Sequence, residues 1–103
     1  MRLRVLEEAE AELISAMLFY EDHQEGLGQD FFERVSEAIE SIARDPARYP
    51  VYEGKRISRV FRRAKVDRFP YLILYQLRED ETLVVAVAHS SQHSGYWENR
   101  NTQ

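Results

Sequence analysis

The side chains best suited to polar chemistry in this sequence are concentrated in its second half. Guanidinium and ammonium groups can stabilise negative charge on a phosphate, and imidazole and phenol groups can transfer protons. Cleavage of RNA needs both kinds of group, because the 2′-hydroxyl must be activated, the leaving oxygen protonated and the phosphorane charge stabilised. The candidates among these side chains are Arg62, Arg63, Lys65, Arg68, His89, His93 and Tyr96, of which Arg63, His89 and Tyr96 are the candidates for a catalytic role.

Several of these side chains also have a structural interpretation. His89 can close a strand through a backbone hydrogen bond, and the Arg62-Arg63 pair can be a solvated strand edge that limits aggregation, in place of an electrostatic docking site. Trp97, which follows Gly95 and Tyr96, is expected to anchor the core at one end of a sheet, with a contact surface as the alternative. The residues expected to contact a target are therefore Arg62, Arg63, Lys65, Arg68, His89, Tyr96 and Trp97.

Length and charge indicate one small domain whose two halves differ. The chain has 103 residues, 44% of them hydrophobic, which suits one core over residues 1–100 and leaves 101–103 as a polar, disordered tail. The formal net charge is -4. Residues 1–54 carry 13 acidic and 5 basic side chains, whereas residues 55–103 carry 5 acidic and 9 basic ones. The second half can therefore present a basic face to phosphates or to an acidic protein, unless the glutamates simply line the wet sides of helices.

Several functional classes are excluded by composition. The absence of cysteine removes disulfides, thiolate nucleophiles and cysteine-ligated zinc. The three histidines have no metal-binding spacing, and no glycine-rich phosphate loop or serine nucleophile elbow is present, so neither a metal nor a cofactor is expected. No apolar stretch suits a signal peptide or a membrane span, and a cytoplasmic protein is expected.

Two helices are expected in the first half. A short strand over 3–6 should precede a helix from 7 to about 23, whose apolar stripe consists of Leu6, Ala9, Leu13, Ala16 or Met17, and Tyr20. Gly26-Leu27-Gly28 should break this helix. A second helix is expected over about 29–44, ended by Asp45-Pro46, with an inward face made by Phe32, Val35, Ile39 and Ile42. The two should form an antiparallel hairpin.

Strands are expected in the second half, after an ordered connection over 48–55. Alternation predicts a strand over about 58–66 with a partly basic face, and β-branched and aromatic residues predict strands over 71–77 and 82–88 that form a hairpin. The order of elements predicts an α+β fold, with an N-terminal strand and a helical hairpin packed on a C-terminal antiparallel β-meander.

Segments spread over nearly the whole chain resemble toxins of the RelE/ParE superfamily, including the ParE-like plasmid stabilisation proteins. The resemblance lies in Ala9 through Tyr20-Glu21, Gly26-Leu27-Gly28 with Phe31 or Phe32, Pro46, Tyr49-Pro50, Arg68-Phe69-Pro70-Tyr71, and His89 to Gly95-Tyr96-Trp97. It implies the same fold and a role as the toxin of a type II toxin-antitoxin system. Members of this superfamily have the same fold but one of two activities: ribosome-dependent cleavage of messenger RNA or poisoning of DNA gyrase.

The pattern after His89 favours gyrase as the target. Many relatives carry an arginine pair two and three residues after this histidine and a proline before the glycine, where this chain has Ser91, Gln92 and Ser94. The missing guanidiniums weaken the interpretation as a RelE-like mRNA endonuclease that acts with the ribosome. The preferred hypothesis is a ParE-like, non-enzymatic toxin that binds DNA gyrase. An inactive member that only binds antitoxin is a further alternative.

A cognate antitoxin is the expected partner, in a hetero-oligomeric complex. An extended antitoxin segment could add to a sheet edge, and an amphipathic helix could lie beside the helical hairpin. The basic second half favours an acidic antitoxin tail, so the association rate should fall with salt.

Overall fold

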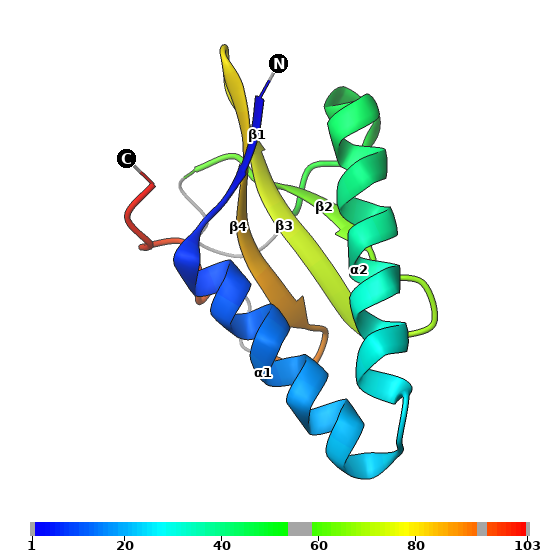
Figure 1. Cartoon of the computed structure of the whole chain (residues 1–103). Helices are drawn as coiled ribbons and strands as arrows, with labels where there is room; N and C mark the ends of the chain where they lie inside the picture. The colour runs from blue at the N-terminus through cyan, green and yellow to red at the C-terminus, as the bar shows by residue number, and fades with distance from the viewer. Residues whose placement is uncertain (1, 54–58, 93–94, 103) are drawn as a thin grey trace.

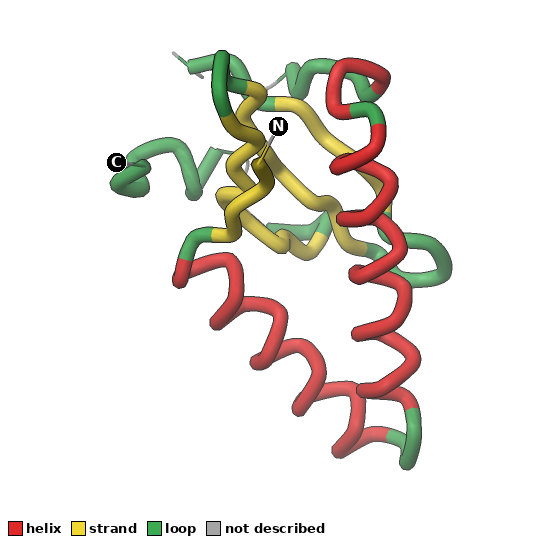
Figure 2. Tube along the Cα trace, turned by 45° about the horizontal axis from the view of Figure 1, so that its top comes forward, coloured by secondary structure: helices red, strands yellow, loops and turns green. Residues whose placement is uncertain are grey.

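The computed structural model describes residues 2–53, 59–92 and 95–102. Along the chain these form β1 (Arg2–Val5), α1 (Glu7–His23), α2 (Leu27–Arg44), the short 3-10 helix η1 (Pro46–Arg48), β2 (Arg62–Lys65), β3 (Tyr71–Leu77) and β4 (Glu81–His89). The two helices lie over one face of the sheet (Figure 1) and diverge from their connecting turn (Figure 2). Among the described residues, no helix is long and apolar enough to cross a bilayer.

The sheet confirms the predicted α+β fold and adds a parallel strand to it. Its order is β1-β4-β3-β2. β2, β3 and β4 form the expected antiparallel meander, while β1 pairs in parallel with β4. β1 begins one residue earlier than predicted and ends before Leu6. β2 is shorter than the predicted strand over 58–66, whose first residue lies outside the described ranges.

The turn between the helices corrects one expectation. The break lies at residues 24–26, where Gly26 has a left-handed φ of 88°, whereas Gly28 is buried inside α2. A Cβ atom on Gly28 would lie 2.5 Å from the backbone oxygen of Met17, so glycine is needed there for close helix contact. Glu21 accepts the backbone N–H groups of Gly26 and Gly28 at 2.9 and 3.0 Å, which caps the start of α2.

The core between helices and sheet is strongly aromatic. The predicted stripe on α1 faces inward, but on α2 it is Phe31 that is fully buried, whereas Phe32 is 38% exposed. Phe31 lies one helical turn before Val35 and so shares its face, while Phe32 is rotated away from it. The ring of Phe31 packs on those of Tyr20, Phe69 and Tyr71, so Phe69 and Tyr71 brace the helices against the sheet.

The opposite face of the sheet is covered by the C-terminal segment. Trp97 is only 3% exposed, and its ring packs edge-on against those of Phe61 and Tyr52. Thr102, in the polar tail, is 8% exposed and accepts a hydrogen bond from Arg59 at 3.3 Å. The sheet is thus buried on both faces along its middle.

Candidate partner-binding site

A groove of about 550 Å³ lies between α1 and the end of β4. Its walls combine small and aromatic side chains of α1 with the ends of two central strands. The residues that line it are Ala11, Glu12, Ser15, Ala16, Phe19, Tyr20, Tyr71, Val87, His89, Ser91 and Gln92. Because the floor is largely apolar and the rim carries hydrogen-bonding groups, this groove has the composition of a site for a peptide or protein.

The helix beside the groove is also apolar on its solvent side. Ile14, Leu18 and Phe19 are 50%, 63% and 55% exposed. Ile14 and Leu18 lie one turn apart and form an outward stripe, with Phe19 at its border with the groove. The helix bears glutamates at its start and acidic residues near its end, which are Glu7, Glu8, Glu10, Glu21 and Asp22. An exposed apolar stripe with charged ends is typical of a protein contact surface.

His89 lies at the rim of the groove in a defined tautomer. The backbone N–H of Ser91 lies 3.0 Å from Nδ1 of His89, and the Ser91 hydroxyl lies 2.7 Å from the same atom. A backbone N–H can only donate, so Nδ1 is the acceptor and the proton of the neutral ring lies on Nε2. The ring edge also packs against Tyr71. In this arrangement His89 offers a hydrogen-bond donor to the groove.

Ser91 and Gln92, two and three residues after His89, support this turn. Ser91 binds the imidazole, and the side-chain oxygen of Gln92 accepts the backbone N–H of His89 at 2.8 Å. Neither residue brings positive charge to the groove. His93 and Ser94 lie outside the described residues.

The two adjacent arginines of β2 project from opposite faces of the sheet. Arg62 shares the helix-side face of the sheet with its partner Tyr75, and its guanidinium donates to the backbone oxygens of Tyr49 at 2.6 Å and Ala47 at 3.3 Å. Arg63 points to the opposite face, as alternation along a strand requires. Arg62 therefore anchors the connection after α2.

Arg63 is also distant from His89. Arg63 pairs with Leu74 and His89 pairs with Tyr71, which separates the two by three residues along the sheet and two strands across it. At about 3.3 Å per residue and 4.8 Å per strand, their Cα atoms lie roughly 14 Å apart. They also project from opposite faces, since His89 shares the face of Tyr71. The structure therefore does not bring these two catalytic candidates together.

Tyr96 is held in a part-buried network whose carboxylate, Glu12, also lines the groove. Its hydroxyl donates to Glu12 of α1, and the same carboxylate binds Arg100 at 2.9 and 3.0 Å. Burial and the hydrogen bond to Glu12 raise the pKa of Tyr96 well above its usual range. The hydrogen bond to Glu12 likewise raises the pKa of Arg100. Tyr96 is thus a fixed neutral donor to Glu12.

The remaining candidates divide between surface and core. Lys65 and Arg68 are exposed, and Arg68 occupies the turn between β2 and β3 with a φ of 69°. Trp97 is buried, which confirms its interpretation as a core anchor and leaves little of the ring exposed for contact with a target. Neither Lys65 nor Arg68 lines the groove at His89.

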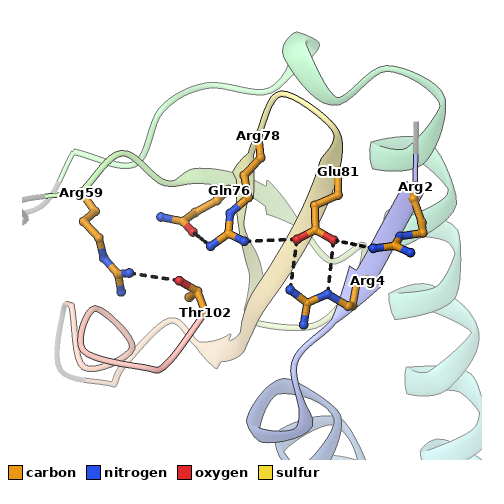
Figure 3. A network of polar contacts seen from close by, with 7 residues as sticks. All are labelled: Arg2, Arg4, Arg59, Gln76, Arg78, Glu81 and Thr102. Carbon is orange, nitrogen blue, oxygen red and sulfur yellow. Dashed lines mark hydrogen bonds and ion pairs between the residues drawn. The ribbon is translucent and has the colours of Figure 1, made fainter.

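A basic cluster at one end of the sheet was missed by the sequence analysis. Arg2, Arg4 and Arg78 surround the carboxylate of Glu81, at 3.5, 3.0 and 3.1 Å (Figure 3). The hydrogen bonds from Arg4 above all lower the pKa of Glu81 to about 2. The alternation of Arg2 and Arg4 along β1 was visible in the sequence, but their common partner lies 77 positions from Arg4 along the chain.

Metal ligation has no support in the described ranges, where no three histidine or acidic side chains gather closely enough to hold an ion. The described polar groups of the groove instead suit hydrogen bonding to a partner.

Comparison with known proteins identifies relatives of this chain. The family described as "ParE toxin of type II toxin-antitoxin system, parDE" matches residues 3–93. No curated protein matches the sequence. Among eight similar chains of known structure is one from the chromosomal ParDE toxin-antitoxin system of P. aeruginosa. It is 13% identical, with a TM-score of 0.71 over 86% of this chain and 95% of that one, and so shares its fold.

Proposed function

Because this chain belongs to the family of ParE toxins of type II toxin-antitoxin systems, we propose that it binds DNA gyrase and is neutralised by a cognate antitoxin. The toxin would act in the cytoplasm as a binding protein. The observation that carries this proposal is the dispersal of the groups that RNA cleavage would need.

Three features of the candidate catalytic groups favour binding over cleavage. Nδ1 of His89 is occupied by Ser91, and the proton of the neutral ring lies on Nε2, so neither ring nitrogen is free to accept a proton. Tyr96 is bound to Glu12. Arg63 projects from the sheet face opposite to His89, while Ser91 and Gln92 bring no positive charge. A phosphorane at His89 would therefore lack charge stabilisation from the described neighbours.

The groove and the adjoining stripe of α1 provide the proposed antitoxin surface. Ile14 and Leu18 are exposed next to a largely apolar groove, so an amphipathic antitoxin helix laid along α1 would bury both. Nε2 of His89 would donate to a carbonyl or carboxylate of the antitoxin at the rim. Acidic residues at the two ends of α1 would pair with basic residues at the ends of that helix.

The target is tested with purified toxin in two parallel assays. We expect the toxin to inhibit supercoiling by gyrase and to increase cleaved DNA, while messenger RNA on translating ribosomes stays intact. Cut messenger RNA with unaffected gyrase would establish the endonuclease alternative. Inactivity in both assays, with antitoxin binding retained, would identify an inactive antitoxin-binding member.

Neutralisation is tested by a matched pair of surface variants. Leu18→Lys places a charge in the proposed antitoxin surface, and Phe32→Lys places one on an exposed apolar position of α2. We expect the first variant to weaken antitoxin binding by roughly tenfold or more while the second changes it little. Equal affinities would remove the α1 stripe from the proposed surface.

A further inference from the structure

We propose that the toxin contacts gyrase through the surface formed by β2, the turn after it and the adjoining residues 50–53, and that this surface takes an acidic segment of gyrase with an apolar side chain. The inference deepens the proposed function, because it rests on gyrase as the target and names the part of the toxin that meets it. It follows from the distribution of basic side chains that the fold itself does not use.

Most arginines in the part of the chain that the structure describes are engaged within the toxin. Arg2, Arg4 and Arg78 surround one carboxylate, and Arg100 binds another. Arg62 donates to two backbone oxygens of the connection after α2. These guanidinium groups stabilise the fold, and their charge or their hydrogen bonds are already matched.

Three basic side chains on β2 and in the turn after it are different. Arg63, Lys65 and Arg68 form no side-chain hydrogen bond or ion pair within the described ranges, and Lys65 and Arg68 are exposed. Arg68 also has a left-handed φ of 69°, a conformation that is unfavourable for a residue with a Cβ atom and that is often retained at functional sites. Positive charge that a partner can use is therefore concentrated along this strand and its turn.

A pocket of about 420 Å³ adjoins these charges, between β2 and the connection that follows η1. Tyr52 in its wall packs edge-on against the buried ring of Trp97, so this wall is fixed by the core. Lys65 follows Arg63 by two residues and projects from the same face, roughly 7 Å along the strand. The residues that line the pocket are Pro50, Val51, Tyr52, Glu53 and Arg63.

The composition of this surface suits a protein better than the phosphates of a nucleic acid. A phosphate would be attracted by Arg63 and Lys65 but repelled by Glu53 in the pocket wall. Val51 is 42% exposed and offers apolar area that a phosphate does not use. A carboxylate beside the two cations, together with an apolar side chain over Val51, uses both kinds of group, as the polar rim and apolar centre of protein interfaces do.

The surface is separate from the groove beside His89. β1 and β2 are the two outer strands of the sheet, with α1 and the groove on its helix side (Figure 1). Arg63 and Lys65 project from the opposite face. Asp67, which precedes Arg68, lies 3.6 Å from Arg34 of α2 and is partly neutralised by it. The groove thus stays available for the antitoxin while the β2 surface meets gyrase.

The test measures binding of the full chain to purified gyrase, with and without a linear DNA duplex. Arg63→Glu and Lys65→Glu each reverse a charge on the proposed surface. Arg44→Glu makes the same change at the exposed end of α2, on a side chain that likewise has no described hydrogen bond or ion pair. We expect the first two variants to weaken gyrase binding by roughly tenfold or more, and Arg44→Glu by less than about threefold. All three should keep their affinity for the antitoxin within about threefold.

Hydrogen exchange of the native chain gives a second measurement that does not depend on how the variants fold. Amides over residues 50–53 and 62–66 should exchange more slowly when gyrase is bound. Amides of α1 should exchange at the same rate with and without gyrase.

Three outcomes would overturn this assignment while the native toxin still binds gyrase and the proposed function stands. Gyrase affinities of the β2 variants equal to that of Arg44→Glu, with slower exchange in α1 alone, would place the contact elsewhere. Weaker binding seen only with DNA present would assign the surface to phosphates. Weaker antitoxin binding with gyrase binding intact would assign it to the antitoxin. A native toxin that does not bind gyrase would overturn both proposals.

Discussion

Glu12 on α1 binds both terminal nitrogens of Arg100, at 2.9 and 3.0 Å, and thereby ties the first helix to the C-terminal segment. Glu12 also accepts the backbone N–H of Val87, and Arg100 donates to the backbone oxygen of Val85, both on the edge of β4. One ion pair thus joins three parts of the chain that are far apart in sequence.

Loss of the charge on Glu12 should destabilise the fold. The side chains of Arg100 and Glu12 are 16% and 20% exposed, so Glu12→Gln would leave a mostly buried guanidinium without its counter-ion. We expect a loss of about 2–3 kcal/mol in the free energy of unfolding, measured with urea. Glu10→Gln, on the exposed side of the same helix, should change it by less than about 0.5 kcal/mol. Similar free energies of unfolding for both variants would contradict a stabilising role of the Glu12–Arg100 ion pair.

Stability should depend on pH through Glu81. Its folded pKa of about 2 lies below its ordinary value of 4.5, because Arg4 donates to the carboxylate. The ionised form therefore stabilises the fold above pH 4.5, and this contribution is lost as the pH falls from 4.5 toward 2. Urea unfolding across this range should show the difference between the native chain and Glu81→Gln shrinking as the pH falls. A constant difference would rule out this titration, and Glu79→Gln in the exposed turn serves as control.

The two glycines at the helical turn should respond differently to substitution. Gly28→Ala places a Cβ atom 2.5 Å from the Met17 oxygen, and overpacking of this kind costs about 1–3 kcal/mol. Gly26→Asn meets nothing within 4 Å, and asparagine tolerates a positive φ, so its cost should stay below about 1 kcal/mol. Thermal unfolding of the two variants measures the contrast. A more stable Gly28→Ala chain would show that the helices do not touch there.

Truncation of Trp97 should cost more than any surface change. The ring is 3% exposed between Tyr52, Phe61 and Tyr96, and Trp97→Ala should lower the free energy of unfolding by about 3–5 kcal/mol. Trp97→Phe keeps much of the contact and should retain a cooperative transition. An alanine variant that melts like the native chain would place the ring on a binding surface instead.

Antitoxin capture should depend on salt. Arg2 and Arg4 on β1 and Arg63 and Lys65 on β2 lie on the sheet face away from the helices, at its two opposite edges, whereas the ends of α1 are acidic. An antitoxin with matching charges would be steered to these surfaces. We expect the association rate, measured by stopped flow, to fall steeply between low and physiological salt while the dissociation rate changes less. An association rate independent of salt would exclude electrostatic steering.

Periodicity and composition were enough to predict the α+β class, the helical hairpin and the strands of the meander. These features depend on neighbours within a few residues, such as the apolar stripe of α1 and the β-branched runs of β3 and β4. The resemblance was likewise carried by local segments, and the structure now explains several of them. Glu21 caps Gly26 and Gly28, and Phe69 and Tyr71 brace Phe31.

The composition of the site was decided only by tertiary structure. Whether Arg62 and Arg63 act together depends on strand alternation and on the connection that receives Arg62, and the role of Glu12 depends on Arg100, 88 positions away. The parallel pairing of β1 with β4 makes β1 an outer strand of the sheet, which no local pattern reveals. Sequence determines which side chains can bind or react, but only packing between distant segments determines which of them meet.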